Sequence, residues 1–247
     1  MKLSGNTIFI TGGTSGIGRA LAEALHQRGN QVIISGRRRG FLAEVTAANP
    51  GMKSLELDVE NPASITAAAK RLTSEFPKLN VLINNAGIMQ VDDASTPLDD
   101  QQAVSIVTTN LLGPIRMTCA LIEHLKKQPD AAVIHVTSGL GFVPLAMTAV
   151  YSATKAALHS YALSQRYKLA GTSVKVLELA PPWVQTDLLN SKNEPRAMPL
   201  KAFIEETMVV LGTDTDEVLV ERVRPLRNNP GSGEWDFIKQ FNDRLTQ

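Results

Sequence analysis

Short apolar runs alternate with longer amphipathic segments through the first 180 residues of the chain. The apolar runs are rich in Val, Ile and Leu and do not alternate with polar residues, which indicates strands buried on both faces of a parallel sheet. Six strands are expected, at Thr7–Ile10, Gln31–Ser35, Ser54–Leu57, Val81–Ile83, Ala132–Val136 and Val174–Leu179. Strands that alternate with helices imply right-handed crossovers, so the pattern predicts a doubly wound α/β fold.

Helical patterns fill the intervals between these strands. They cover Ile17–Arg28, Phe41–Ala48, Ala63–Glu75, a long stretch around Asp99–Lys126, and Ala153–Leu169. After Leu179 the alternation stops at a Pro-Pro pair, and an irregular segment extends to about Leu200. Three further helix-like stretches follow, at Leu200–Val210, Asp214–Arg224 and Glu234–Leu245. With no linker or repeat, residues 1–247 are expected to form one domain, with residues 182–247 as a helical lid over the substrate.

Composition excludes several classes of protein. The 247 residues carry a net charge of +1, so no basic excess points to nucleic acid or to an anionic membrane. The lone Cys119 cannot form an internal disulfide, which fits a reducing compartment. No signal-peptide pattern and no uninterrupted apolar run of about 18 residues is found, so a cytoplasmic location is expected. The four histidines lack metal-ligand spacing, and no metal is expected.

The turn between the first predicted strand and the first predicted helix is rich in glycine. Gly12, Gly16 and Gly18 stand there in the spacing Gly-x-x-x-Gly-x-Gly. Glycine permits positive φ and close approach of the backbone to a phosphate, and the free N–H groups at a helix start face an anion. A turn that is glycine-rich only for packing is the alternative, but the strand–turn–helix context favours a site for a dinucleotide pyrophosphate.

The glycine loop, Thr-Gly-x-x-x-Gly-Ile-Gly, resembles that of the short-chain dehydrogenase/reductase family. Further family motifs follow in order over residues 1 to about 190: Asp58, Asn84-Asn85-Ala86-Gly87, Asn110, Ser138, Tyr151-x-x-x-Lys155, Pro181 and Thr186. The resemblance implies a Rossmann-type fold and a nicotinamide cofactor. The cofactor-binding residues that it implies are Gly12, Thr14, Ser15, Gly16, Ile17, Gly18, Ser35, Arg37, Arg38, Asp58, Val59, Asn85, Ala86, Gly87, Tyr151, Lys155, Pro181, Val184 and Thr186.

Tyr151 and Lys155 lie one helical turn apart on the same face. A pair with this spacing can simply decorate a helix surface, but the order of motifs favours catalysis. A free phenol has a pKa of about 10, and a nearby ammonium together with an oxidised nicotinamide is expected to lower that pKa. By the resemblance, Tyr151 is the general acid/base, Lys155 also bonds the nicotinamide ribose, Ser138 orients the substrate oxygen and Asn110 holds a water in a proton relay. From residue type alone, Ser138 could merely end a strand and Asn110 could pack in a helix bulge.

The end of the second predicted strand bears on the choice of cofactor. Folds that prefer NAD usually place an acid about 20 residues beyond the glycine loop, and Gly36 holds that position here, followed by three arginines. A guanidinium can bind the 2′-phosphate bidentately, so the sequence predicts NADP(H), with Arg37 as first candidate and Arg38 as second. By the resemblance, Ser35 assists. A solvated helix start is the alternative, and Ser15, where some NADP-dependent members carry a basic residue, leaves room for NAD(H).

The loops expected around the nicotinamide are apolar. Their candidate substrate-pocket residues are Met89, Leu140, Phe142, Leu145, Trp183 and Leu188. These side chains could instead pack against the lid. Because no arginine in these loops is placed to clamp a carboxylate, the sequence favours a small, neutral, hydrophobic ketone or secondary alcohol over a keto acid or a coenzyme A thioester.

The resulting prediction is an NADP(H)-dependent oxidoreductase, a carbonyl reductase or alcohol dehydrogenase. The alternative is a redox sensor or regulatory protein that binds the cofactor without turnover, which would be expected to have lost Tyr151, Lys155 or Ser138. The long middle helix carries more apolar residues than one stripe against a sheet requires. We therefore expect a homodimer or homotetramer, an association that the family resemblance also implies.

Overall fold

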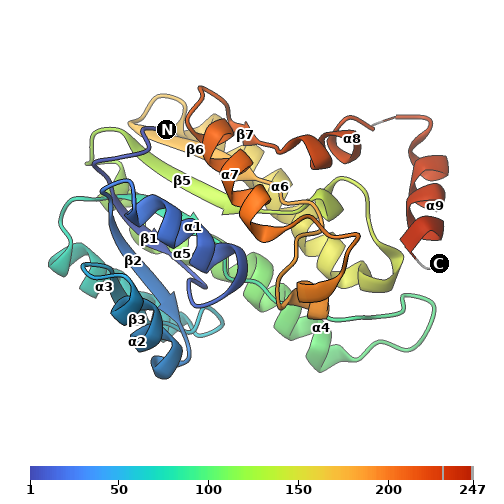
Figure 1. Cartoon of the computed structure of the whole chain (residues 1–247), viewed down its shortest axis with the longest axis horizontal. Coiled ribbons are helices and arrows are strands. Elements are labelled where there is room, and N and C mark those ends of the chain that lie inside the picture. Colours follow the sequence, from blue (N-terminus) through green and yellow to red (C-terminus); the bar gives the residue numbers. More distant parts are fainter. Residues whose placement is uncertain (230, 246–247) are drawn as a thin grey trace.

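The computed structural model describes residues 1–229 and 231–245. Within them, a parallel sheet of seven strands runs in the order β3-β2-β1-β4-β5-β6-β7 (Figure 1). The strands are β1 (Thr7–Ile10), β2 (Gln31–Gly36), β3 (Lys53–Glu56), β4 (Leu79–Asn84), β5 (Ala131–Val136), β6 (Val174–Leu179) and β7 (Glu217–Val218). The order reverses between β1 and β4, the point at which open α/β sheets bind ligands.

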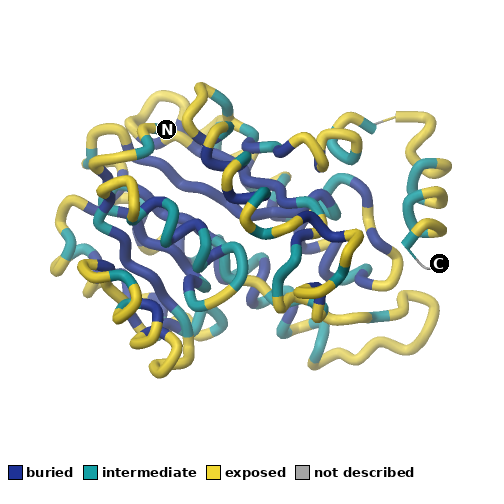
Figure 2. Tube along the Cα trace, in the orientation of Figure 1, coloured by how far each residue is buried: buried dark blue, intermediate teal, exposed yellow. Residues whose placement is uncertain are grey.

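Helices cover both faces of this sheet. One face packs against α1 (Gly16–His26), α2 (Arg39–Ala48) and α7 (Leu200–Leu211), and the other against α3 (Pro62–Glu75), α5 (Gly113–Leu125) and α6 (Ala149–Leu169). Successive strand residues point to opposite faces: Ile8 and Ile10 belong to the first core and Phe9 to the second. The strands are accordingly buried along most of their length (Figure 2). The Rossmann-type architecture predicted from the alternating pattern is confirmed.

The long middle helix is not continuous. It consists of α4 (Asp100–Val107), a π-helical turn (Thr108–Leu112) and α5. The turn buries Asn110 completely, and π-bulges of this kind are frequent at functional sites. Helix α6 begins four residues earlier than predicted, at Ala149, so Tyr151 lies inside its first turn.

The predicted helix at Asp214–Arg224 is wrong. The chain instead forms the short strand β7, a 3₁₀ turn (Glu221–Val223) and the short helix α8 (Arg224–Arg227). Val218 pairs with Leu179 of β6 in the sheet, and Val218, Val220 and Val223 are fully buried in the first core. Pairing with the edge strand β6 has overridden the local helical pattern. The β-branched side chains of Val218 and Val220 themselves favour a strand.

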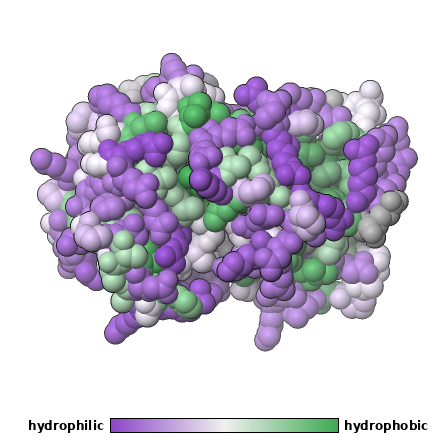
Figure 3. Space-filling view, viewed as in Figure 1, coloured by the Kyte–Doolittle hydropathy of each residue, from purple (hydrophilic) through white to green (hydrophobic). Residues whose placement is uncertain are grey.

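The C-terminal helix α9 (Glu234–Leu245) stands apart from the main body at the right-hand end of Figure 1. Asn242 ties it to the loop after β5, because its side-chain amide donates to the Pro144 carbonyl at 3.0 Å and its oxygen accepts from the Ala146 N–H at 2.5 Å. In the space-filling view, hydrophobic side chains gather next to this helix on a face that is otherwise largely hydrophilic (Figure 3).

One helical stretch, Asp100–Leu125, is long and apolar enough to cross a membrane by length and composition. No uninterrupted apolar run was evident there, but its mean hydropathy passes that test. Its most apolar window is 44% buried inside the fold, where Met117, Leu121 and Leu125 of α5 pack in the second core. That packing is typical of the core helix of a globular domain.

Candidate active site

A cavity of about 1350 Å³ opens at the carboxyl ends of the central strands. The residues that line it include the predicted Gly12, Thr14, Ser15, Gly16, Ile17, Gly18, Ser35, Arg37, Arg38, Asp58, Val59, Asn85, Ala86, Gly87, Ser138, Tyr151, Lys155, Pro181, Val184 and Thr186. The fold therefore brings together at one site the motifs that the sequence spreads over some 175 positions.

The glycine loop is held in a shape that only small residues allow. Gly12 has φ of +70°, and a Cβ there would lie 2.8 Å from the Cα of Ala86. Asn85 fixes the loop from the next strand, since its amide donates to the carbonyls of Thr11 and Gly12 at 3.0 and 3.1 Å. Ser15 precedes α1 in an extended conformation, and its side chain makes no capping hydrogen bond. The helix N-terminus thus offers its backbone N–H groups to the cavity, which fits a pyrophosphate.

The nucleotide end of the cavity carries the two predicted arginines. The Arg37 side chain is 65% exposed and lies 3.7 Å from Glu60, while the Arg38 guanidinium stacks 4.1 Å from the centre of the Phe41 ring. A Cβ on Gly36 would meet the Thr14 side chain at 3.0 Å. Ser35 is buried, and its hydroxyl donates to the Ile10 carbonyl at 3.3 Å. The arrangement presents cations where an NAD-preferring fold presents an acid.

Tyr151, Ser138 and Lys155 form one buried cluster. The Ser138 hydroxyl lies near the Tyr151 phenol, where it acts to lower the pKa of that phenol. The Lys155 ammonium lies 5.5 Å from the centre of the Tyr151 ring and donates to the Val136 carbonyl at 2.9 Å. A phenol, a hydroxyl and an ammonium are thereby gathered where a carbonyl oxygen could receive a proton.

Asn110 lies behind this cluster and does not line the cavity. Its side-chain amide makes two hydrogen bonds to the backbone of Ile88: the oxygen accepts from the Ile88 N–H at 2.9 Å, and the nitrogen donates to the Ile88 carbonyl at 2.8 Å. A Cβ placed on Gly87 would be 3.3 Å from the Asn110 oxygen and 3.7 Å from the Lys155 nitrogen, so both groups flank Gly87. Asn110 thus holds the backbone of Ile88 in place beside Lys155. These contacts match the alternative in which Asn110 is a helix-bulge asparagine with a packing role.

Burial shifts both titrating groups toward their neutral forms. It raises the pKa of Tyr151 to about 12, with the Ser138 hydrogen bond acting in the opposite direction. It lowers the pKa of Lys155 to about 8. This chain's own residues therefore move the phenol's pKa in the direction opposite to the one expected from the sequence, because desolvation outweighs the opposing effect of Ser138. The phenol is therefore protonated at neutral pH.

The other end of the cavity is largely apolar, as predicted. Met89, Leu140, Leu145, Trp183 and Leu188 all line it. Phe142 does not, and its assignment to the pocket is wrong: its ring packs edge-on against His159, with centroids 5.1 Å apart, and under Arg227. The 3₁₀ turn at Gly139–Gly141 directs Leu140 and Phe142 to different sides.

Several lining residues were not among the predicted substrate-pocket residues, although all but Met147 belong to the segment predicted as a lid. They are Met147, Arg196, Arg222, Leu226, Phe241, Arg244 and Leu245. The arginines among them, Arg196, Arg222 and Arg244, lie outside the apolar loops in which no arginine was expected. Arg196 is paired with Glu194 at 2.9 Å and lies over the Trp183 ring. No local motif marks these residues, since the folding of the tail places them here.

Comparisons with known proteins agree with this site. The short chain dehydrogenase family model matches residues 6–197. The uncharacterized oxidoreductase DltE of Bacillus subtilis is 39% identical over 253 residues, covering 100% of this chain and 99% of that protein. A short-chain dehydrogenase from Burkholderia cenocepacia, solved in complex with NADP, superposes with a TM-score of 0.83 at 26% identity over the full length of both chains.

A second solved structure carries the other nicotinamide cofactor. The 3-ketoacyl-(acyl-carrier-protein) reductase of Brucella melitensis, complexed with NADH, has a TM-score of 0.78 at 26% identity and covers 89% of this chain and 95% of that one. Proteins similar to this one in fold thus include one solved with NADP and one solved with NADH. By the family match and the full-length relative, the chain is an oxidoreductase that belongs to the short-chain dehydrogenase/reductase family.

Proposed function

We propose that the protein is an NADP(H)-preferring carbonyl reductase or alcohol dehydrogenase that acts on a small, neutral, hydrophobic ketone or secondary alcohol. The observation that carries the proposal is the buried cluster of Tyr151, Ser138 and Lys155 between a glycine-loop nucleotide site and apolar walls. Hydride transfer to a carbonyl leaves an alkoxide that needs a proton, and the Tyr151 phenol is the candidate donor.

Each group in the cluster has a distinct part in this chemistry. The nicotinamide cofactor supplies or accepts the hydride. Tyr151 gives its phenol proton to the alkoxide. Ser138, whose hydroxyl lies near the same phenol, orients the substrate oxygen. Lys155 holds the nicotinamide ribose and supplies positive charge, and Asn110 acts indirectly by fixing the strand-end backbone next to Lys155.

The preference for NADP(H) rests on the end of β2. Arg37 is largely exposed and only loosely paired with Glu60, so its guanidinium is free to turn to a 2′-phosphate. Gly36 brings no acid to oppose that phosphate. The residues from 182 onward act as a lid at the substrate end, with α9 closing the side farthest from β1.

A second candidate substrate class is a carbonyl compound with an anionic group at its far end. The arginines Arg196, Arg222 and Arg244 at the outer part of the cavity favour it. Arg196 is neutralised by Glu194, so Arg222 and Arg244 are the better anion ligands. An apolar wall near Tyr151 suits both classes, and they differ only in the end of the substrate that lies away from the reacting carbon.

The decisive experiment follows nicotinamide absorbance while the protein is incubated with NADPH and a panel of aryl and aliphatic ketones. The panel includes each ketone in matched neutral and ω-carboxylate forms. Turnover of the neutral ketones supports the first candidate, and preference for the carboxylates supports the second. Tight NADPH binding with no turnover of any carbonyl or alcohol would instead support a cofactor-binding sensor or regulator.

We further propose that the protein self-associates as a homodimer or homotetramer through α4, α5 and α6. Val104 of α4 and Leu163 of α6 are 56% and 42% exposed, and Tyr167 of α6 is 82% exposed. An exposed apolar face on paired helices usually has a partner. Light scattering after size exclusion, at micromolar concentration, tests this, and a mass near 26.7 kDa would refute it.

A further inference from the structure

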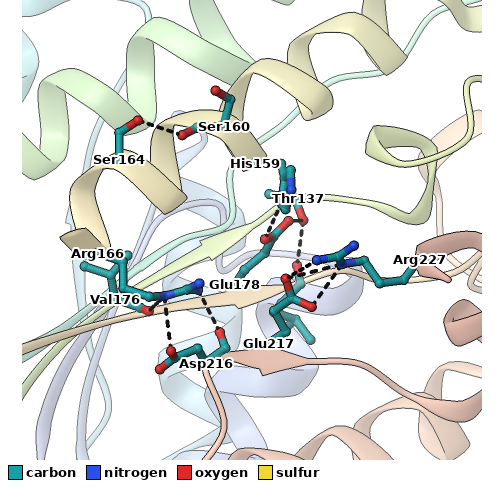
Figure 4. Close-up of polar contacts among 11 residues, drawn as sticks. Thr137, His159, Ser160, Ser164, Arg166, Val176, Glu178, Asp216, Glu217 and Arg227 are labelled. Carbon is teal, nitrogen blue, oxygen red and sulfur yellow. Dashed lines mark hydrogen bonds and ion pairs between the residues drawn. The ribbon is translucent and has the colours of Figure 1, made fainter. Parts of the chain in front are cut away.

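A chain of hydrogen bonds behind the cavity joins strand β5 to helix α6 (Figure 4). At its centre is Glu178 of β6. One carboxylate oxygen accepts a hydrogen bond from the Thr137 hydroxyl at 2.6 Å, and the other lies 2.6 Å from Nδ1 of His159. Because the partner is a carboxylate, Nδ1 of His159 carries the proton and donates it. One side chain thus bridges the two elements that carry the catalytic candidates.

Both ends of this chain adjoin the catalytic cluster. Thr137 stands between Val136, whose carbonyl accepts from the Lys155 ammonium, and Ser138, whose hydroxyl lies near the Tyr151 phenol. His159 lies one helical turn after Lys155, on the same side of α6. The contact Thr137–Glu178–His159 therefore fixes how far the end of β5 lies from the catalytic turn of α6.

The carboxylate is buried at a cost that local packing alone does not explain. Glu178 has no exposed surface, and a buried carboxylate is unfavourable unless hydrogen bonds and charges compensate it. An apolar residue would fill the same place in β6 without this requirement. What the carboxylate adds is two acceptors that bind donors from two different elements.

The cluster is not arranged around a metal ion. His159, Glu178 and Glu217 each offer a ligand atom within 4.8 Å of the others. However, Arg227 donates to both oxygens of Glu217 at 3.0 Å, and 2.6 Å between His159 and Glu178 is the distance of a strong hydrogen bond. Protein donors already satisfy both carboxylates.

A second polar contact between the same helix and strand offers a matched control. Arg166, about two turns beyond His159 on α6, donates to the Val176 carbonyl of β6 at 3.0 Å and to the Asp216 carbonyl at 3.2 Å (Figure 4). It holds α6 on the sheet, as His159 does, but within the described residues it makes no hydrogen bond to Thr137 or to the end of β5. A variant that lacks the Arg166 side chain therefore shows how losing a contact between α6 and the sheet affects stability, without disturbing Thr137 or the end of β5.

We propose that Thr137, Glu178 and His159 are positioning residues for the reaction proposed above, setting the distance between Ser138, just after β5, and the Tyr151–Lys155 turn on α6. The inference rests on the proposed function. None of the three is a catalytic residue: Glu178 and His159 do not line the cavity, and Thr137, which does, donates its hydroxyl proton to Glu178. They act through their neighbours in sequence and in the helix.

The test uses isosteric and conservative variants in steady-state kinetics with NADPH. Thr137→Val removes only the hydroxyl and His159→Leu removes the donor, whereas Thr137→Ser and His159→Gln keep a donor. We expect the first two variants to lower kcat about 10- to 100-fold, the scale of a displacement of about 1 Å in a reacting group. The KM for the carbonyl and the Kd for NADPH, measured by nicotinamide fluorescence, stay within about threefold. Thr137→Ser and His159→Gln recover most of kcat.

Two control variants, Arg166→Ala and Tyr151→Phe, distinguish a positioning role from a structural one and from failure of the proposed function. Arg166→Ala is expected to lower Tm as much as His159→Leu while leaving kcat near wild type. Equal loss of kcat in Arg166→Ala, or full kcat in Thr137→Val and His159→Leu, would overturn the positioning role. Tyr151→Phe is assayed alongside: if it too retains turnover, the proposed function has failed rather than this inference.

Discussion

The two ends of the cavity are built in different ways. The nucleotide end consists of turns directly after β1, β2 and β4, where Gly12 and Gly16 adopt positive φ and Asn85 holds the loop through its backbone carbonyls. The substrate end combines the loops after β4 and β5 with the irregular segment after β6, with α8 and with α9. The first end depends on local backbone geometry and the second on how the tail folds back, so substitutions should affect them independently.

Tyr151→Phe should have the largest effect, because both ends of the cavity converge on this phenol. We expect the fold and NADPH binding to persist and kcat to fall by at least the roughly 10²–10⁴-fold typical of a general acid/base. Steady-state kinetics and fluorescence titration with NADPH check both parts. A variant that keeps more than about a tenth of wild-type turnover would exclude Tyr151 as the acid.

Arg37→Asp tests the nucleotide end alone. A charge-assisted pair with the 2′-phosphate should contribute about 1.5–3 kcal/mol, so we expect the preference for NADPH over NADH to fall roughly 10- to 150-fold. The measurement is kcat/KM with each cofactor, and KM for the carbonyl should not change. Equal kcat/KM values of the wild type with NADPH and NADH would contradict the proposed preference for NADP(H). If the ratio of the two values is unchanged in Arg37→Asp, Arg38 becomes the candidate ligand of the 2′-phosphate.

The contrast also explains what could be predicted from the sequence. Strand and glycine-loop positions follow from short-range patterns, and Asn61 caps α3 through bonds to Ala63 and Ser64 with Pro62 in the first turn. Tyr151, Lys155 and Ser138 could be paired because family motifs occur in a fixed order at strand ends. These features need little information beyond about 20 neighbouring residues.

The remaining features depend on contacts that span the chain. Val218 becomes a strand because β6 offers an unpaired edge, and nothing local distinguishes it from a helical residue. Phe142 turns away from the cavity because His159 and Arg227 receive its ring. The pKa of Tyr151 is raised by burial, which the Tyr-x-x-x-Lys spacing does not reveal.

Lys155, where the two ends meet, should leave a signature in the pH dependence of stability. Its pKa is about 8 in the folded protein and about 10.5 in the unfolded chain. Between these values the unfolded state binds more protons, so stability should rise with pH. From pH 8 to 10 the expected gain in the free energy of unfolding is about 2 kcal/mol.

Denaturant unfolding of the wild type and Lys155→Met at pH 8, 9 and 10 isolates this contribution from the other titrating groups. The gain should be absent in Lys155→Met. Above about pH 10 the raised pKa of Tyr151 acts with the opposite sign, because the unfolded phenol loses its proton first. Parallel pH curves for the two proteins would mean that Lys155 is not desolvated as described.

Asn242→Ala tests the substrate end alone and should have the smallest effect. The side chain bonds the Pro144 carbonyl and the Ala146 N–H on either side of Leu145, which lines the cavity. Each bond contributes a net 0.5–1.5 kcal/mol or so, and solvent can replace part of that, so a rise of about threefold to tenfold in KM for the carbonyl is expected, with kcat and NADPH affinity nearly unchanged. Asp236→Asn on the same helix, which disturbs only an exposed pair with Lys239, is the control. If both variants raise KM equally, the effect comes from general weakening of α9; if neither does, α9 has no part in binding substrate, and the two ends of the cavity differ less than their construction implies.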